Sequence, residues 1–188
     1  AYIYNGFAGL GVSTADIRAG ETLDLLDTLY AMLLPSACEA SNIIADYIGD
    51  GQISRFVDMM NAKAKQLGAV NTHFTNAHGL YDADQVTTAK DMYLITKHAL
   101  TLPLFEEIST TVTYSMKATN KHAEPRYITH TNHMLSAYLG GSMYYKKMRG
   151  IKTGSLPEVG KNLVSLATDN GYTYLLVTLG APTQDSNG

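Results

Sequence analysis

Apolar residues recur at two different spacings along this chain, and the change of spacing divides it into two parts. From residue 22 to about 109 they return every three or four positions, which is the period of a helix with one buried face. From about 110 to 182 they gather in short runs rich in Val, Ile, Tyr and Thr, which is typical of strands. The pattern predicts helices first and antiparallel strands last, an α+β arrangement.

Proline, glycine and capping residues set the ends of the expected helices. Pro35 ends the first helix, and Ser36 with Glu39 forms the Ser-x-x-Glu pattern of a capping box at the start of the second. Gly68 is placed to end the third helix, and Thr88 is placed to begin the fourth. The expected helices span about 22–34, 36–48, 53–67, 88–99 and 104–108.

The β-rich part ends in the clearest local signal of the sequence. Residues 162–168 and 172–179 form two strand-like runs, and the Asn-Gly pair between them favours a tight hairpin turn. Because both runs carry apolar residues on each face, we expect helices to cover one or both sides of the hairpin. Two further strands are expected at 111–114 and 148–155. The chain shows no repeat and no linker, so it is predicted to form one unit.

Composition excludes several classes of protein. The 188 residues carry 14 Lys and Arg against 17 Asp and Glu, and a net charge of −3 gives no basic field for binding nucleic acid. The longest apolar runs are far shorter than the roughly 20 residues of a membrane helix. With 45% apolar and 16% charged residues the chain is too apolar for intrinsic disorder, and its single cysteine, Cys38, excludes an internal disulfide.

Two short stretches carry side chains suited to catalysis. Ser36-Ala37-Cys38 lies at the junction of two expected helices, and Lys152-Thr153-Gly154 lies on an expected strand. Each has a plain structural explanation when taken alone, because a serine three residues before a glutamate is a typical helix cap and Lys-Thr-Gly is a common tripeptide. The two stretches gain weight only in combination.

The spacing of the histidines raises the question of a metal site. His130 and His133 lie three residues apart, and His73 and His78 share one loop, which are spacings that a zinc site can use. No other side chain supplies a clear third ligand. Loop histidines with ordinary hydrogen bonds are therefore the better interpretation, and we expect neither a metal nor another cofactor.

Taken together, the order and spacing of several segments resemble one enzyme family. The segments are residues 33–42 (LLPSACEASN), 71–74 (NTHF), 77–80 (AHGL), 88–92 (TAKDM) and 150–154 (GIKTG). They resemble the serine-type D-alanyl-D-alanine carboxypeptidases, which are the low-molecular-mass penicillin-binding proteins of the peptidase S11 family. The resemblance extends from about residue 9 to residue 182. It implies a fold like that of penicillin-binding proteins and serine β-lactamases, with a helical cluster packed on an antiparallel sheet.

The resemblance also implies a reaction and the residues that carry it. Members of the family remove the terminal D-alanine of peptidoglycan stem peptides through an acyl-enzyme, using Ser-x-x-Lys, Ser-x-Asn and Lys-Thr-Gly motifs. Ser36 matches the serine of the second motif and would relay a proton, while Cys38 stands where the family has asparagine and contacts substrate. Lys152 would hold the hydroxyl network and attract the terminal carboxylate. The other expected substrate-binding groups are the Thr153 hydroxyl, the side-chain-free Gly154 and the backbone N–H of Ser155.

The sequence departs from the family in one decisive way. No serine in the 188 residues has a lysine three positions later, so the Ser-x-x-Lys motif that supplies the nucleophile is missing. We therefore expect the chain to be a fragment of a larger enzyme, a partial domain over residues 1–188 that is incomplete at both ends. On its own the fragment is expected to be inactive.

The family resemblance sets further expectations about setting and alternatives. It implies a protein acting outside the bacterial cytoplasmic membrane on stem peptides ending in D-Ala-D-Ala, with a parent enzyme that binds β-lactam antibiotics and for which membrane association stays open. Two alternatives also stay open at this point. One is a related β-lactamase-like serine hydrolase, and the other is a non-catalytic remnant that binds cell-wall peptide.

Overall fold

The arrangement of helices and strands follows the two-part pattern of the sequence. The computed structural model describes residues 2–4, 7 and 10–183. Its α-helices are α1 (Leu25–Leu33), α2 (Cys38–Ile48), α3 (Ile53–Gln66), α4 (Ala89–Ala99), α5 (Phe105–Thr110) and α6 (Ala137–Gly140). Its strands are β1 (Thr113–Met116), β2 (Arg126–Thr129), β3 (Met148–Leu156), β4 (Gly160–Asp169) and β5 (Tyr172–Ala181). Short 3-10 helices are η1 (Tyr2–Tyr4), η2 (His133–Leu135) and η3 (Gly141–Met143). The predicted α+β class is confirmed.

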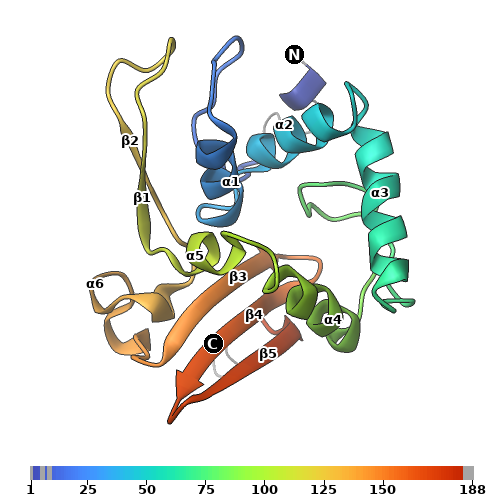
Figure 1. Cartoon of the computed structure of the whole chain (residues 1–188), viewed down its shortest axis with the longest axis vertical. Coiled ribbons are helices and arrows are strands. Elements are labelled where there is room, and N and C mark those ends of the chain that lie inside the picture. The colour runs from blue at the N-terminus through green and yellow to red at the C-terminus, as the bar shows by residue number, and fades with distance from the viewer. Residues whose placement is uncertain (1, 5–6, 8–9, 184–188) are drawn as a thin grey trace.

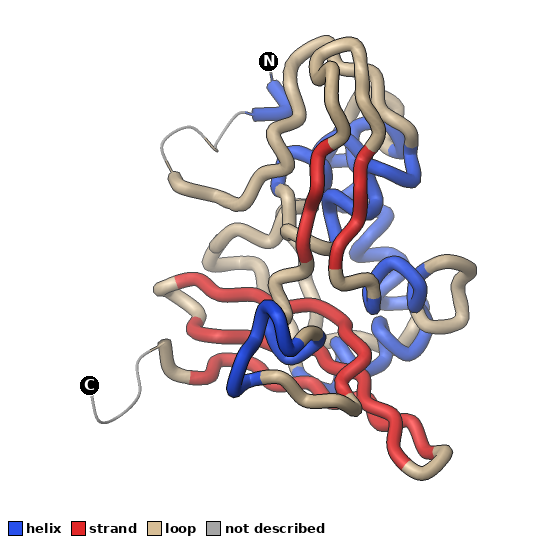
Figure 2. Tube along the Cα trace, turned by 90° about the vertical axis from the view of Figure 1, so that its left-hand side faces the viewer, coloured by secondary structure: helices blue, strands red, loops and turns tan. Residues whose placement is uncertain are grey.

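The strands form two separate antiparallel sheets. Strands β3, β4 and β5 make one sheet in that order, while β1 and β2 make a two-stranded ribbon. Figure 2 shows the ribbon standing apart from the three-stranded sheet. The turn between β4 and β5 places Asn170 and Gly171 at φ values of +48° and +81°, as the Asn-Gly pair requires. The predicted hairpin and its place beside the strand of Lys152 are confirmed.

Several elements differ from the prediction for physical reasons. Strand β2 was not expected, because only four residues pair there and a polar stretch precedes them. The expected strand at 111–114 begins two residues later, at Thr113. Of the two faces of the hairpin, one packs against helix α4, whereas Tyr172, Tyr174 and Leu176 on β5 are 69%, 58% and 61% exposed. Residues 1–21 show no clear apolar period and are expected to form a loop with a possible short strand, and residues 1, 5–6 and 8–9 of this segment lie outside the described residues.

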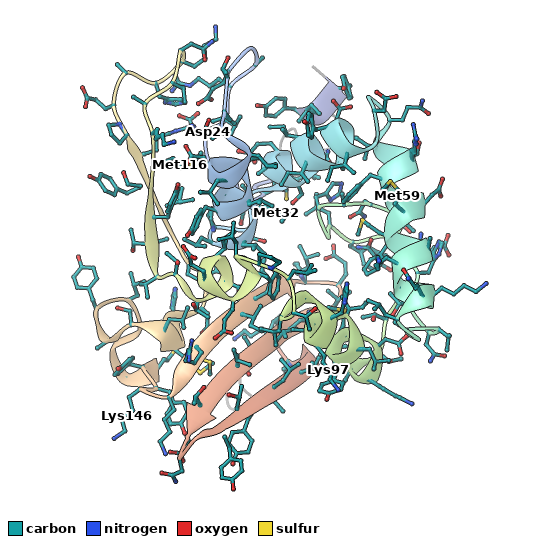
Figure 3. The ribbon with its side chains drawn as sticks, in the orientation of Figure 1. Asp24, Met32, Met59, Lys97, Met116 and Lys146 are labelled. Atoms are coloured by element: carbon teal, nitrogen blue, oxygen red, sulfur yellow. The ribbon has the colours of Figure 1, made fainter. Side chains whose placement is uncertain are left out.

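Two hydrophobic clusters form the interior. Figure 1 shows the elements that carry them, with α5 lying between α1 and the three-stranded sheet. The first joins α1, α2 and the β1–β2 ribbon, and Figure 3 places Met116 of the ribbon beside α1. The second joins Ile151, Val164 and Leu166 of the three-stranded sheet to side chains of α4 and α5. Helix α5 takes part in both, because Ile108 lies in the first cluster and Phe105 packs against the second.

The β1–β2 ribbon is fixed to helix α1 by an aromatic side chain. The ring of Tyr114 stacks on Tyr30 with centroids 3.6 Å apart, and its hydroxyl donates to Asp27 at 2.6 Å. Asp27 also accepts from the backbone N–H of Lys117 at 3.2 Å. Because β2 leads directly into residues 130–132, the place of the ribbon also fixes where that segment lies.

Candidate active site

Strand β3 carries the Lys-Thr-Gly motif at the edge of its sheet. Within the described part of the chain β3 pairs only with β4, where Lys152 lies opposite Val164 and Gly154 opposite Asn162. The Lys152 side chain is half-buried, and its Nζ donates to the Thr153 carbonyl at 2.8 Å. Burial lowers the pKa of Lys152 from its usual 10.5 to about 8. The charge of a Cys38 thiolate would raise it, but this effect is smaller.

The motif lines a cavity of about 570 Å³. Lys152, Thr153 and Gly154 form one side of it, and neighbouring residues of β4 and β5 extend that side. The opposite wall is the loop between α3 and α4, whose lining residues include Phe74, Leu80 and Tyr81. A volume of this size is typical of a small-molecule or peptide site.

The loop that forms the opposite wall is held by side chains that the sequence analysis did not single out. Asn61 of α3 pairs with the backbone of Phe74 in both directions, at 2.8 and 2.7 Å. The side-chain oxygen of Gln85 accepts from the backbone N–H groups of Thr75 and Asn76. Asp91, which is 1% exposed, accepts from the backbone N–H of Asn71 at 2.7 Å. The only sequence signal for this ordered loop was its high content of Asn, Gln, Asp and Gly, which are typical turn residues.

Ser36 does not cap helix α2, so the predicted capping box is wrong. The helix begins at Cys38 after Ala37, and no side chain caps its first turn. Ser36 lies in the short turn between α1 and α2 and has a φ of +64°, a left-handed conformation that is uncommon for a residue with a side chain. The Glu39 carboxylate turns to another partner and accepts from the backbone N–H groups of Ala15 and Ile17 at 2.7 and 3.4 Å.

Cys38 is a buried residue rather than an activated thiol. It is 4% exposed, and its backbone N–H donates to the Ser13 carbonyl at 3.0 Å. Burial raises the pKa of the thiol, with a further contribution from Glu39, while Lys152 acts in the opposite direction.

The expected site residues are therefore brought together only in part. Lys152, Thr153 and Gly154 share the cavity, whereas Ser36 is not among its lining residues. That Ser36 and Lys152 face one cleft stays a prediction. Ser155 is exposed and lies opposite Lys161 of β4, and neither Ser155 nor Cys38 lines the cavity.

The histidines do not assemble into a metal site. His130 is 2% exposed, whereas its partner in the proposed spacing, His133, is exposed. Across residues 2–4, 7 and 10–183, no three His, Cys, Asp or Glu side chains gather as a metal would need. In the same residues, every helix is too short or too polar to cross a lipid bilayer.

Comparison with known proteins points to one family. A family model described as D-alanyl-D-alanine carboxypeptidase, peptidase S11, matches residues 5–183. The D-alanyl-D-alanine carboxypeptidase of Streptomyces sp. strain K15 is 30% identical over 186 residues, covering 93% of this chain and 62% of that protein. DacC of Escherichia coli K12 is 33% identical over 175 residues, covering 92% of this chain and 40% of that protein. The chain thus spans less than two thirds of the length of these relatives.

Solved structures agree in fold. The Streptomyces K15 DD-transpeptidase superposes with a TM-score of 0.81 at 29% identity, covering 91% of this chain and 66% of that one. The D-alanyl-D-alanine carboxypeptidase of Mycobacterium tuberculosis H37Rv gives 0.81 at 26% identity, covering 94% and 63%. The fold is that of the penicillin-binding DD-peptidases, as expected. Two solved variants of the K15 enzyme each replace one residue, a serine in one and a cysteine in the other. That serine and cysteine lie two residues apart, as Ser36 and Cys38 do in this chain.

The left-handed backbone at Ser36 predicts an unusual order of stabilities. Both Ser36→Gly and Ser36→Ala remove the hydroxyl, but only glycine adopts a positive φ without strain, so the glycine variant should be more stable by about 1 kcal/mol. Urea unfolding of the 188-residue chain measures the difference. At Ser41, inside helix α2, the same pair of changes should give the opposite order, because alanine favours a helix. Equal stability of the two Ser36 variants would contradict the backbone described here.

Proposed function

The chain belongs to the D-alanyl-D-alanine carboxypeptidase family, peptidase S11, and on that basis we propose that the whole protein removes the terminal D-alanine of peptidoglycan stem peptides. The observation that carries the proposal is the Lys152-Thr153-Gly154 strand at the rim of a cavity large enough for a peptide. Such a reaction proceeds by attack of a serine, a tetrahedral oxyanion and release of the acyl group by water.

Each group on strand β3 has a part in that reaction. The Lys152 ammonium attracts the carboxylate at the end of the stem peptide, and the Thr153 hydroxyl donates to the same carboxylate. Gly154 has no side chain, and a Cβ built there would meet only Asn162 at 3.7 Å, so an extended peptide can lie against the backbone. The backbone N–H of Ser155 supplies one donor to the oxyanion.

Ser36 and Cys38 do not line the cavity of the described residues, and we propose that they complete the site from the α2 side in the whole protein. The Ser36 hydroxyl both donates and accepts a hydrogen bond, which suits it to pass a proton toward the leaving amine. Cys38 is buried and its pKa is raised, so at neutral pH it is a thiol that offers substrate only a weak donor. Substrate contact at this position is therefore weaker than an asparagine would give.

The nucleophile is the part of the machinery that these residues do not supply. None of the serines in the 188 residues is followed three positions later by a lysine. Three residues after Ser36 stands Glu39 instead of lysine, and its Oε1 accepts from the backbone N–H groups of Ala15 and Ile17. The attacking serine and its lysine base would therefore come from a part of the protein outside this sequence.

We also propose a cellular setting for the whole protein. Stem peptides ending in D-Ala-D-Ala belong to the cell wall, so the whole protein would work outside the cytoplasmic membrane. β-Lactams, which carry an acylating amide and a carboxylate, would acylate the same serine. The expected partners are thus the stem peptide and β-lactam antibiotics.

Labelling with a fluorescent penicillin tests the proposal. The 188-residue chain should form no covalent adduct, since loss of a nucleophile and its base costs on the order of a million-fold in turnover. The whole protein should label at a serine outside these residues and should release D-alanine from a stem peptide. Peptide mapping of the labelled band locates the serine. Stoichiometric labelling of the short chain would contradict the proposal, and a whole protein that neither labels nor releases D-alanine would favour a peptide-binding remnant.

The lowered pKa of Lys152 predicts how acylation depends on pH. As the pH rises through about 8 the ammonium loses its charge, so its attraction for the carboxylate is lost on the alkaline side. Acylation of the whole protein by penicillin should fall about tenfold between pH 7 and pH 9. Lys152→Arg should keep its charge and remove that fall, even if the rate at pH 7 is lower. Lys161→Arg, an exposed position on β4, is the control, and an unchanged alkaline limb in Lys152→Arg would contradict the assignment.

A further inference from the structure

A three-residue segment after strand β2 joins the two sides of the proposed site. The backbone N–H of Thr131 donates to the carbonyl of Leu34, two residues before Ser36, at 3.1 Å. The hydroxyl of the same residue is hydrogen-bonded to the hydroxyl of Thr153 at 2.5 Å. Thr131 therefore contacts both the Ser36 loop and the Lys-Thr-Gly strand.

His130 anchors this segment in the interior. It is 2% exposed, and its Nδ1 accepts from the backbone N–H of Asn132 at 2.9 Å. The ring proton must then lie on Nε2, which donates to the carbonyls of Ser109 and Ile151 at 3.2 and 3.0 Å. Burial lowers the pKa of His130, which favours this neutral form. The histidine thus ties the end of α5 to the residue directly before Lys152.

Asn132 continues the attachment along the same strand. Its side-chain N–H donates to the Gly150 carbonyl at 3.4 Å, and its side-chain oxygen accepts from the backbone N–H of Met134 at 3.1 Å. At Gly150 the strand lies so close to α5 that a Cβ would stand 2.5 Å from the Ser109 carbonyl. Residues 130–132 therefore hold β3 at three points, namely Gly150, Ile151 and Thr153.

We propose that Thr131 is a positioning residue that orients the Thr153 hydroxyl toward the substrate carboxylate. Each threonine hydroxyl has one proton. When Thr131 donates to Thr153, the proton of Thr153 is free to be donated to the carboxylate. The hydrogen bond from the Thr131 N–H to the Leu34 carbonyl fixes the position of Thr131 relative to the Ser36 loop. The proposal rests on the proposed function, because it needs a substrate that ends in a carboxylate.

Two variants separate the hydroxyl of Thr131 from its bulk. Thr131→Val keeps the shape and removes the hydroxyl, while Thr131→Ser keeps the hydroxyl. NMR signals of the Thr153 and Gly154 amides in the 188-residue chain report binding of N-acetyl-D-Ala-D-Ala. The same measurement is made with the dipeptide that ends in a neutral amide. Thr129→Val, a half-buried threonine of β2 whose hydroxyl has no partner among the described residues, is the control.

The expected result is a loss confined to the carboxylate ligand. Thr131→Val should weaken binding of the carboxylate dipeptide about fivefold to tenfold and leave the amide unchanged, whereas Thr131→Ser and Thr129→Val should keep the preference for the carboxylate. An equal loss for both ligands, or none, would overturn the positioning role and leave the proposed function intact. If the unaltered chain shows no preference for the carboxylate, the proposed function fails and this inference fails with it.

Discussion

The two hydrophobic clusters of this protein are separate, and the geometry of the proposed site depends on what holds them together. The first cluster fixes the loop of Ser36 and the second fixes the strand of Lys152. Apolar packing between them is supplied by α5, which contributes Phe105 to one and Ile108 to the other. Polar contacts add to this packing, among them the hydrogen bonds of residues 130–132 to the Leu34 carbonyl and to β3. Directional bonds of this kind fix distances that non-directional burial leaves adjustable.

Elements governed by local chemistry could be predicted from the sequence. Helix α3 has a strong period, Thr88 accepts from the backbone N–H of Asp91 at 3.1 Å as a cap should, and the Asn-Gly turn closes its hairpin. The capping box predicted from Ser36 and Glu39 is wrong, because Glu39 instead accepts from backbone amides of a segment more than twenty residues earlier, which no local pattern indicates. Strand β2 depends likewise on a partner, β1, and on burial of Ile128 rather than on its own four residues.

The candidate site divides in the same way. The Lys-Thr-Gly strand is visible in the sequence because its residues are consecutive. The opposite wall of the cavity comes from a loop whose shape depends on Asn61 and Asp91, two polar residues on different helices. The burial that lowers the pKa of Lys152 and raises that of Cys38 arises from tertiary packing, which no local pattern encodes. The sequence analysis considered His130 only as a metal ligand and did not single out Thr131 and Asn132, because the role of all three depends on tertiary hydrogen bonds to the Leu34 loop and to β3.

We propose that strand β3 is the carboxylate-holding wall of a D,D-carboxypeptidase site. A crystal structure of the whole protein acylated by a penicillin tests it most directly. The account predicts an ester to a serine outside these 188 residues, with the β-lactam carboxylate about 2.7–3.0 Å from the Thr153 hydroxyl and beside the Lys152 ammonium. An ester on Ser36, or a carboxylate bound away from β3, would contradict it.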